Sequence, residues 1–274
     1  MKYSDLECLE VSLDDGVATV AIDHPPLNLF DLPLIRDMDA LARKLEADRD
    51  VRVAVIKSAN PDFFIAHADV EMISQQQPSS RVQVETPNGF QQMTERFRRL
   101  PQVTIGQIEG RARGGGSEFL LALDMRFAAI GSALLSQPEV ALGIIPGGGG
   151  TQRLPRVLGR ARALEIVLGC EDFDAELAER YGYINRALPA KDIERFVQRL
   201  ARRIAGFPPA AVARAKAAVD AVDVQLSDGL ATENHHFERT LADPETRKRM
   251  ARFLANGGQT PAGEKDLDKV LGKL

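Results

Sequence analysis

The sequence predicts an α/β fold with a helical extension, and three observations support this prediction. Short apolar runs of strand type, interleaved with loops and helical patterns, fill roughly the first 145 residues. After Gly159 these runs disappear, and Ala, Arg, Leu and Glu at helical spacing dominate. No long linker separates the two parts. We therefore expect one integrated unit rather than two independent domains.

The first predicted elements are a hairpin, a helix and a strand. Residues 6–13 and 17–22 are strand candidates joined by Asp14-Asp15-Gly16, a hairpin turn signal. Pro25 and Pro26 then break the chain, and residues 32–45 carry apolar side chains at helical spacing. A compact apolar run at 51–57 predicts the next strand, which ends in a loop at 58–62.

The rest of the chain continues the alternation and then becomes helical. We expect a short helix from Val70, helices at 91–100 and 114–123, and strands at 103–109 and 125–128. The polar stretch 75–88 predicts a mobile surface segment. Later helical patterns cover 160–168, 174–180, 191–205, 208–222 and 228–254. The tail beyond Asn256 is polar, and we expect it to be poorly ordered.

The composition excludes several classes of function. The chain has 274 residues, of which 44% are hydrophobic, enough for a sizeable core. A formal net charge of −4 argues against a general role in binding nucleic acid or a membrane surface. The two cysteines, Cys8 and Cys170, make no disulfide framework. The N-terminus is too charged for a signal peptide, and no window approaches the roughly 18 apolar residues of a membrane helix. We expect a cytoplasmic protein.

Two segments combine a predicted strand end with small residues. In the segment 63–69, Ala66 and Ala68 let the backbone approach a ligand just before a helix begins. In the segment 110–118, three glycines precede Glu118 and leave backbone amides open to an anion or oxyanion. A plain strand-to-helix connection, tight packing at the glycines, or dipole compensation by Glu118 would also account for these patterns.

A third segment places Glu139 after Gln137-Pro138 and before a glycine run at 147–150. No Gly-Lys-Ser/Thr ending follows the run, so a nucleotide phosphate loop is excluded, and the Rossmann pattern is absent too. The histidines show no metal-ligand spacing, so we expect no metal site. Glu118 and Glu139, each beside a glycine-rich turn, are the candidate acid–base pair of an enzyme.

Together these segments resemble the crotonase family, also called enoyl-CoA hydratase/isomerase. The most specific stretches are Gly-Gly-Gly-Ser-Glu at 114–118 and Gln-Pro-Glu-Val-Ala-Leu-Gly-Ile-Ile-Pro at 137–146, and the similarity runs from Pro25 to about Phe253. The resemblance implies a spiral of ββα units followed by a helical C-terminal trimerisation region. The core with the CoA thioester site would span 1–195, and the integrated helical region 196–274.

The resemblance also implies residue roles. The amides of Ala68 and Gly115 would hold the thioester oxygen as an oxyanion hole, and Glu118 and Glu139 would handle protons. Residues expected to bind the substrate or its CoA part are Leu27, Ala66, Asp69, Val70, Gly114, Pro138 and Gly147. No cofactor is implied, because coenzyme A enters as part of the substrate.

Both carboxylates together favour hydration of a 2-enoyl-CoA. The alternatives are double-bond isomerisation, thioester hydrolysis, decarboxylation, or a non-catalytic binding protein of the same fold. We expect a homotrimer or hexamer. The acyl chain length is left open, because the residues expected to line the acyl pocket lie in the irregular stretch between Gln75 and Phe97.

The chain departs from the family pattern in three places. His67 stands where the family usually has glycine, which would matter if the backbone needed a positive φ. Three interpretations of His67 are open. Its side chain faces the surface and only tilts the loop, or it enters the pocket and changes the substrate or the reaction. In the third interpretation, it weakens the oxyanion site. The stretch between Asp124 and Glu139 is one residue longer, which predicts a bulge that keeps Glu139 in register. Asn256 replaces a lysine that meets CoA phosphate in many relatives, and this weakens the expectation of a CoA contact from a neighbouring subunit.

Overall fold

Two sheets form the frame of the molecule. The computed structural model describes residues 3–77, 86–222 and 225–274. The larger sheet has the order β1-β2-β3-β5-β7-β10, in which β1 and β2 are antiparallel and every later pair is parallel. Its strands are β1 (Leu9–Asp14), β2 (Val17–Ile22), β3 (Val53–Ser58), β5 (Val103–Ile108), β7 (Met125–Ile130) and β10 (Arg186–Pro189).

The smaller sheet has the order β4-β6-β8-β9. Its first three strands are parallel, and β9 is antiparallel to β8. These strands are β4 (Phe63–Ile65), β6 (Arg111–Arg113), β8 (Leu134–Ser136) and β9 (Phe173–Asp174). Three successive strand pairs, β3/β4, β5/β6 and β7/β8, each place their first strand in the larger sheet and their second in the smaller one before the chain enters a helix. The expected spiral of ββα units is confirmed.

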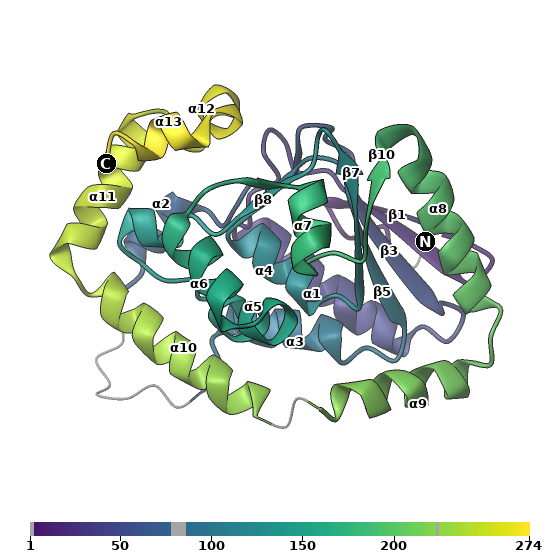
Figure 1. Cartoon of the computed structure of the whole chain (residues 1–274). Helices are drawn as coiled ribbons and strands as arrows, with labels where there is room; N and C mark the ends of the chain where they lie inside the picture. Colours follow the sequence, from purple (N-terminus) through teal and green to yellow (C-terminus); the bar gives the residue numbers. More distant parts are fainter. Residues whose placement is uncertain (1–2, 78–85, 223–224) are drawn as a thin grey trace.

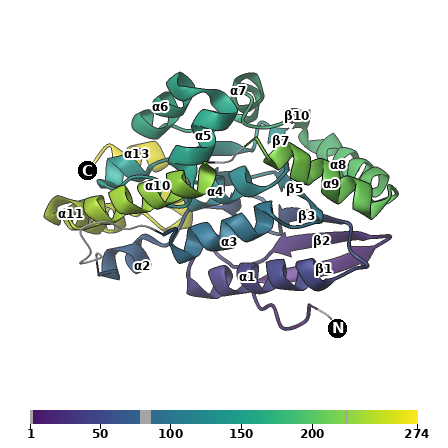
Figure 2. The same cartoon turned by 90° about the horizontal axis from the view of Figure 1, so that it is seen from below.

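The helices complete the layers. Figure 1 shows the order of the elements, and Figure 2 shows α1 and α3 beside the sheet. The first group is α1 (Leu32–Ala47), α2 (Val70–Gln75), α3 (Gly89–Arg98), α4 (Gly115–Ala122), the 3₁₀ helix η1 (Glu139–Leu142), α5 (Gly150–Leu158), α6 (Arg160–Gly169) and α7 (Ala175–Tyr181). The second group is α8 (Ala190–Ala205), α9 (Pro209–Asp220), α10 (Leu226–Leu241), α11 (Pro244–Ala255), α12 (Pro261–Lys265) and α13 (Leu267–Leu271).

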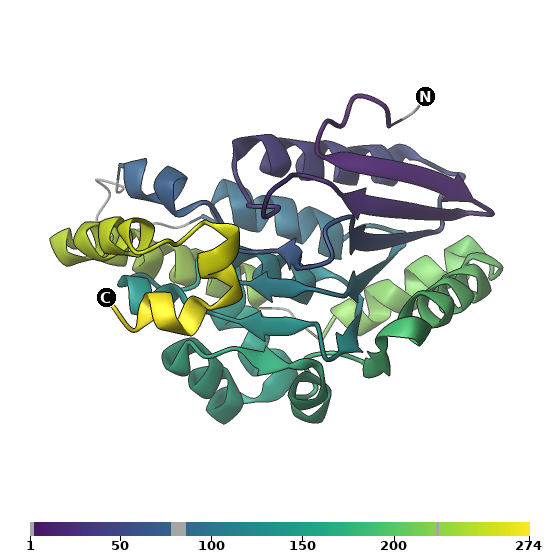
Figure 3. The ribbon, with the colours of Figure 1, turned by 90° about the horizontal axis from the view of Figure 1, so that it is seen from above.

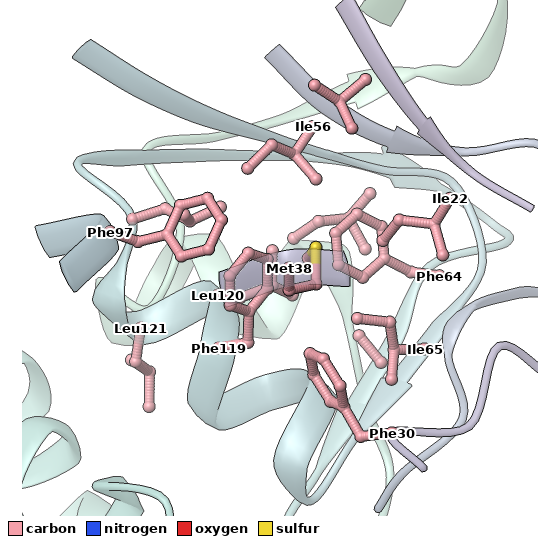
Figure 4. Packing of buried hydrophobic residues seen from close by; sticks show 14 of the residues in the cluster. Ile22, Phe30, Met38, Ile56, Phe64, Ile65, Phe97, Phe119, Leu120 and Leu121 are labelled. Carbon is pink, nitrogen blue, oxygen red and sulfur yellow. The ribbon is translucent and has the colours of Figure 1, made fainter. Parts of the chain in front are cut away.

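The main core lies between the sheets and the helices α1, α3 and α4 (Figure 4). Phe119 is central to it, with its ring edge-on to Phe97 at 5.0 Å and to Phe30 at 5.8 Å between centroids. Strand β5 is buried along its whole length because helices or strands cover both faces, which is why it reads as a continuous apolar run. This packing fixes α4, and therefore its N-terminus, against the ends of the strands.

The C-terminal helices wrap around this frame. Helix α8 packs Ile193, Val197 and Ala201 on the far face of the larger sheet, so residue 195 falls inside a helix that covers the core. In Figure 1, α9 and α10 pass along the lower edge of the view, and α11 turns upward. Figure 3 shows the yellow α12 and α13 beside α11, on the side away from α8 and α9. A small apolar cluster joins α2, η1 and α10 to α13 through Val70, Leu142 and Leu267.

Three predictions about the second half are wrong. Strands do not disappear after Gly159, since β9 and β10 follow it. The helix expected at 228–254 is two helices, because Asp243 caps a new helix that has Pro244 in its first turn. The tail beyond Asn256 forms α12 and α13, which bury Glu264, Leu267 and Val270.

Two further predictions concern loops. Most of the polar stretch 75–88 lies outside the described residues, since 78–85 are not described. Between β7 and β8 the chain makes a turn at Gly131 with a positive φ of 88°, closed by the Ala133 amide donating to the Ala129 carbonyl at 3.1 Å. The described β6–β8 pairing runs without a register shift. Within the described ranges, no helix is both long and apolar enough to cross a membrane.

Candidate functional site

A cavity of about 430 Å³ lies where the N-terminus of α4 meets α2, η1 and the C-terminal helices. Its walls are mainly apolar, and its polar side chains include two buried carboxylates, those of Glu118 and Glu139. The apolar wall is formed by Leu32, Ile35, Val70, Met72, Ile73, Phe90, Leu142, Ile144, Ile145, Phe237, Phe253, Leu267 and Leu271. An apolar cavity with a few convergent polar groups is typical of a site for a small molecule.

Ala68 and Gly115, the residues expected to supply the oxyanion amides, both line this cavity. The His67 carbonyl accepts the Phe30 amide at 3.0 Å, and a trans peptide points its N–H away from its carbonyl, so the Ala68 N–H faces away from Phe30. Gly115 is the first residue of α4, where amides have no partner within the helix. A Cβ on Gly115 would lie 3.5 Å from the Ala68 nitrogen, which shows how close the two residues are.

Glu118 extends from the first turn of α4 to the glycine-rich turn before α5. Its Oε1 accepts the amides of Gly148 at 2.7 Å and Gly150 at 2.8 Å. The approach is so close that a Cβ on Gly148 would lie 2.7 Å from Glu118 Oε2. Glycines at these positions therefore let the two amides bind Oε1 of the carboxylate, while the side chain lines the cavity.

Glu139 begins η1 on the other side of the same cavity. A Cβ on Gly114, where φ is +47°, would lie 2.8 Å from Glu139 Oε1, so only glycine leaves room for this carboxylate. In the amide orientation of Gln137 that satisfies its neighbours, the nitrogen donates to both Glu139 oxygens at 3.2 and 3.0 Å, and the oxygen accepts the Ser117 hydroxyl.

A third carboxylate lies behind the first two. Glu233, on α10, accepts the amides of Gly149 at 2.6 Å and Thr151 at 2.8 Å, the Gln91 side-chain amide at 2.9 Å, and the Thr151 hydroxyl. Sequence reasoning missed this residue because it is one acid within an amphipathic helix, with no glycine-rich neighbour in the chain to mark it.

Burial of three carboxyls so close together shifts their ionisation. Desolvation, with Glu233 adding like charge, raises the pKa of Glu118 to about 8, against the stabilising amides of Gly148 and Gly150. Desolvation, then the charge of Glu118, holds the pKa of Glu139 well above its usual range. Burial likewise raises the pKa of Glu233. Raised pKa values of this kind in a cavity mark groups that can carry protons at neutral pH.

His67 does not face the surface, so the surface-facing interpretation of this residue is wrong. It is 5% exposed, lines the cavity, and stacks edge-on to Phe253 at 5.8 Å between ring centroids. Its backbone is also not strained, since its φ is not positive. The hydrogen-bond partners of the ring are Ala68 and, in the C-terminal tail, Glu264.

The cavity brings together seven of the residues predicted from the sequence. These are Ala68, Val70, Gly115, Glu118, Pro138, Glu139 and Gly147. Gly114 lies directly beneath Glu139. Leu27 and Ala66 lie outside the cavity in a small apolar cluster, with the Ala66 amide donating to the Leu27 carbonyl at 3.1 Å. Asp69 caps α2 through a bond from the Glu71 amide at 2.9 Å.

Asn256, the third departure from the family pattern, caps α11 by donating from Nδ2 to the Arg252 carbonyl at 2.9 Å. Among the residues the structure describes, no group of three or more His, Cys, Asp or Glu side chains is arranged to hold a metal ion.

Known proteins are similar to this chain in both sequence and fold. A family model described as enoyl-CoA hydratase/isomerase matches residues 12–259. The enoyl-CoA isomerase/hydratase fer4 of Mycosarcoma maydis is 32% identical over 247 residues, which cover 87% of this chain and 89% of that protein. The short-chain-enoyl-CoA hydratase of Clostridium acetobutylicum is 28% identical over 246 residues, covering 87% and 91%. A crystal structure described as that of a candidate enoyl-CoA hydratase from Streptomyces avermitilis is 41% identical, covers 97% of each chain and has a TM-score of 0.88.

Proposed function

Since the chain belongs to the enoyl-CoA hydratase/isomerase family, we propose that it adds water across the double bond of a 2-enoyl-CoA thioester. The observation that carries this proposal is the pair of buried carboxylates, Glu118 and Glu139, on the same cavity as the amides of Ala68 and Gly115. Hydration needs one group to take a proton from water and another to deliver a proton to carbon. The resemblance implies that family members which only isomerise or decarboxylate often keep one of the two carboxylates.

In the proposed reaction, the thioester oxygen lies between the amides of Ala68 and Gly115. Glu118 takes a proton from water as the water oxygen bonds to Cβ, and the double-bond electrons move onto the thioester oxygen as an enolate. Glu139 then gives its proton to Cα, and the thioester carbonyl re-forms. The two amides stabilise the enolate because they are already oriented, and losing one such donor typically costs on the order of 3 kcal/mol.

The pKa shifts support this division of roles. Burial, and then the charge of Glu118, raises the pKa of Glu139 well above its usual range, so this carboxyl keeps the proton that an acid must deliver. The amides of Gly148 and Gly150 favour the ionised form of Glu118, whose pKa of about 8 lets it act as the base. Two neighbouring carboxyls with separated pKa values are the expected arrangement for acid and base in one site.

The substrate also carries coenzyme A, and no other cofactor enters the proposal. We place the nucleotide portion against Leu27 and Ala66, outside the cavity, and the pantetheine end near Asp69 and Val70. Gly114, Pro138 and Gly147 would border the acyl group and the attacking water. The apolar wall of the cavity suits a hydrocarbon acyl chain.

Incubation of the purified protein with crotonyl-CoA and longer 2-enoyl-CoAs tests the proposal, because hydration removes the absorbance of the conjugated thioester. We expect turnover with at least one chain length, and none with any length would refute hydration. A gain of absorbance from 3-enoyl-CoA substrates without hydration would mean isomerisation instead.

Two variants test the roles of the carboxylates. Glu118→Gln and Glu139→Gln each keep the side-chain shape but remove proton transfer, so each is expected to lose a factor of roughly 10²–10⁴ in kcat while still binding acyl-CoA. Full activity of either variant would show that the carboxylate has another role.

We also propose that the chain assembles as a homotrimer or a hexamer of paired trimers. Helix α9 buries none of its residues in the single chain, and Val219 on it is 73% exposed. Val222, just after the helix, is 85% exposed, and neighbouring exposed apolar side chains of this kind suit a subunit contact. Light scattering after size exclusion is expected to give three or six times the mass of one chain, and a monomer would contradict the assembly.

A further inference from the structure

One residue of the C-terminal tail joins the two loops that carry the proposed oxyanion amides. Glu264 Oε1 lies 3.0 Å from Nε2 of His67, the residue before Ala68. Arg113, two residues before Gly115, donates from Nη1 to the Glu264 carbonyl at 2.7 Å, and the same nitrogen is 3.6 Å from Glu264 Oε2. The side chains of Glu264 and Arg113 are fully buried and that of His67 nearly so.

The hydrogen-bond partners of His67 indicate which of its ring nitrogens carry protons. Its Nδ1 lies 2.8 Å from the Ala68 carbonyl, which can only accept, so Nδ1 must carry a proton. Its Nε2 faces Glu264 Oε1, which already accepts the Gln259 amide at 2.7 Å. With a second proton on Nε2, both ring nitrogens donate and the carboxylate accepts. The arrangement favours an imidazolium–carboxylate pair.

The charges around the ring favour this assignment. Glu264 attracts the imidazolium across the shared hydrogen bond, and the pKa of His67 is raised, although burial and Arg113 oppose the shift. The pKa of Glu264 is lowered by His67 and Arg113, against its burial. Arg113 donates two hydrogen bonds to the Asp172 carboxylate, one from Nε at 2.7 Å and one from Nη2 at 2.5 Å. Two positive and two negative groups thus alternate through the network.

The same tail residues also hold the start of α2. The Gln259 side-chain oxygen accepts the Val70 amide at 2.6 Å, and its nitrogen donates to Asp69 Oδ1 at 2.9 Å. Hydrogen bonds also hold the backbone on both sides of the Ala68 Cα. Phe30 bonds the His67 carbonyl and the Asp69 amide, and the His67 ring bonds the Ala68 carbonyl.

We propose that His67 and Glu264 are positioning residues for the oxyanion hole, so that the C-terminal tail sets the geometry of the site through the loops at Ala68 and Gly115. The inference rests on the proposed role of these two amides. In this arrangement the tail is part of the active site, and an imidazolium stands directly before the proposed oxyanion residue Ala68. The lowered pKa of Glu264 and the raised pKa of His67 widen the pH range in which both groups are charged.

Nitrogen NMR of the imidazole rings tests the pair without any substrate. The chain has four histidines, and His67→Gln identifies the signals of His67 by their loss. We expect both ring nitrogens of His67 to be protonated at pH 6 and its titration midpoint to lie above 6.5. In Glu264→Gln the midpoint should fall below 6.5, because burial alone disfavours the imidazolium. A neutral ring at pH 6, or a midpoint that Glu264→Gln leaves unchanged, would overturn the pair.

Kinetics and binding then test positioning. His67→Gln and Glu264→Gln are expected to lower kcat by roughly 10- to 100-fold with little change in KM, since a misplacement of about 1 Å costs up to about that factor. The infrared carbonyl band of bound butyryl-CoA, which cannot react, should shift less from its position in water in these variants than in the unmodified protein. Exchange of the Val70 amide should be faster in Glu264→Gln, because the tail is held less firmly.

Asp266→Asn is the matched control. Asp266 is exposed in the same tail and makes no side-chain bond to the start of α13, so its loss should change neither the carbonyl band nor kcat. A normal carbonyl band and kcat in Glu264→Gln, with the tail loosened, would show that the contact is only structural. Absence of turnover in the unmodified protein would remove the proposed function, while the ring titration and carbonyl band would still decide the pair and its effect on the bound thioester.

Discussion

Glu118 and Glu233 divide the amides of one glycine-rich turn between them. Glu118 accepts those of Gly148 and Gly150, and Glu233 accepts those of Gly149 and Thr151. The N-terminus of α5 is thus bound by two carboxylates from different helices, as its partial positive charge favours. This arrangement fixes the proposed base, and it also couples the pKa of that base to a second carboxyl.

The first prediction concerns pH. Because the proposed base must be ionised and its pKa is raised to about 8, kcat/KM for hydration should rise as the pH increases through that region. At higher pH it should fall again as Glu139 loses its proton. A pH series with crotonyl-CoA measures both limbs, whose midpoints belong to the coupled cluster. A rate that is flat from pH 6 to 9 would contradict the assignment of Glu118.

Glu233→Gln should move the lower limb of this profile toward lower pH. The change removes a like charge that raises the pKa of Glu118, so ionisation of the base becomes easier. It also leaves part of the glycine-rich turn without an acceptor, which should lower the free energy of unfolding by about 1–3 kcal/mol. Asp228→Asn, at an exposed position of α10, is the control, and an equal shift in both variants would rule out a local effect.

Gly148→Ala should slow hydration strongly. The added Cβ would lie 2.5 Å from the Phe90 ring and 2.7 Å from Glu118 Oε2, so the carboxylate or the ring must move. Displacing the base by about 1 Å is expected to cost up to roughly 10²-fold in kcat. Gly169→Ala, where nothing lies within 4 Å of the new atom, should leave kcat unchanged and stabilise α6 by about 0.5–1 kcal/mol. Steady-state kinetics and thermal unfolding of both variants check this.

Leu271→Ala should shift the preference toward longer acyl chains. Leu271, on α13, lines the cavity, so its truncation enlarges the apolar wall. One methylene in such a pocket is worth roughly 10- to 200-fold in discrimination, and we expect the ratio of kcat/KM for longer to shorter 2-enoyl-CoAs to rise by about tenfold or more. Leu164→Ala, on α6 and away from the cavity, should leave the ratio as it is. An unchanged ratio in Leu271→Ala would place the acyl chain elsewhere.

Much of the frame could be predicted because its signals are local. The Asp14-Asp15-Gly16 turn and the buried run of β5 define their own conformations, and each was assigned from a few neighbouring residues. The short strands β4, β6 and β8 have three residues each and pair within the small sheet, so their sequences are indistinguishable from those of loops. The break at Asp243-Pro244 did have a local signal, a cap followed by proline, which the longer helical pattern masked.

The candidate site shows the same division. The glycine runs beside Glu118 and Glu139 were a local signal in the sequence. A glycine leaves room for another side chain to come close, so it indicates a site of this kind. Glu233 is one acid within a helical pattern, and Glu264 lies in the polar tail, where we expected little order. Each reaches the site across more than 80 residues of chain. Their roles depend on how α10 and α12 fold back, which follows from packing over long sequence distances rather than from any local pattern.

The contact between His67 and Glu264 has a consequence for the order in which the protein is made. Translation proceeds from the N-terminus, and the loops at 67 and 113 emerge long before residue 264. Every strand of the two sheets ends by Pro189, ahead of Glu264, so Arg113 and His67 gain their shared carboxylate only after all the strands have been made. Binding competence should therefore arrive late in synthesis, after most of the fold is already in place.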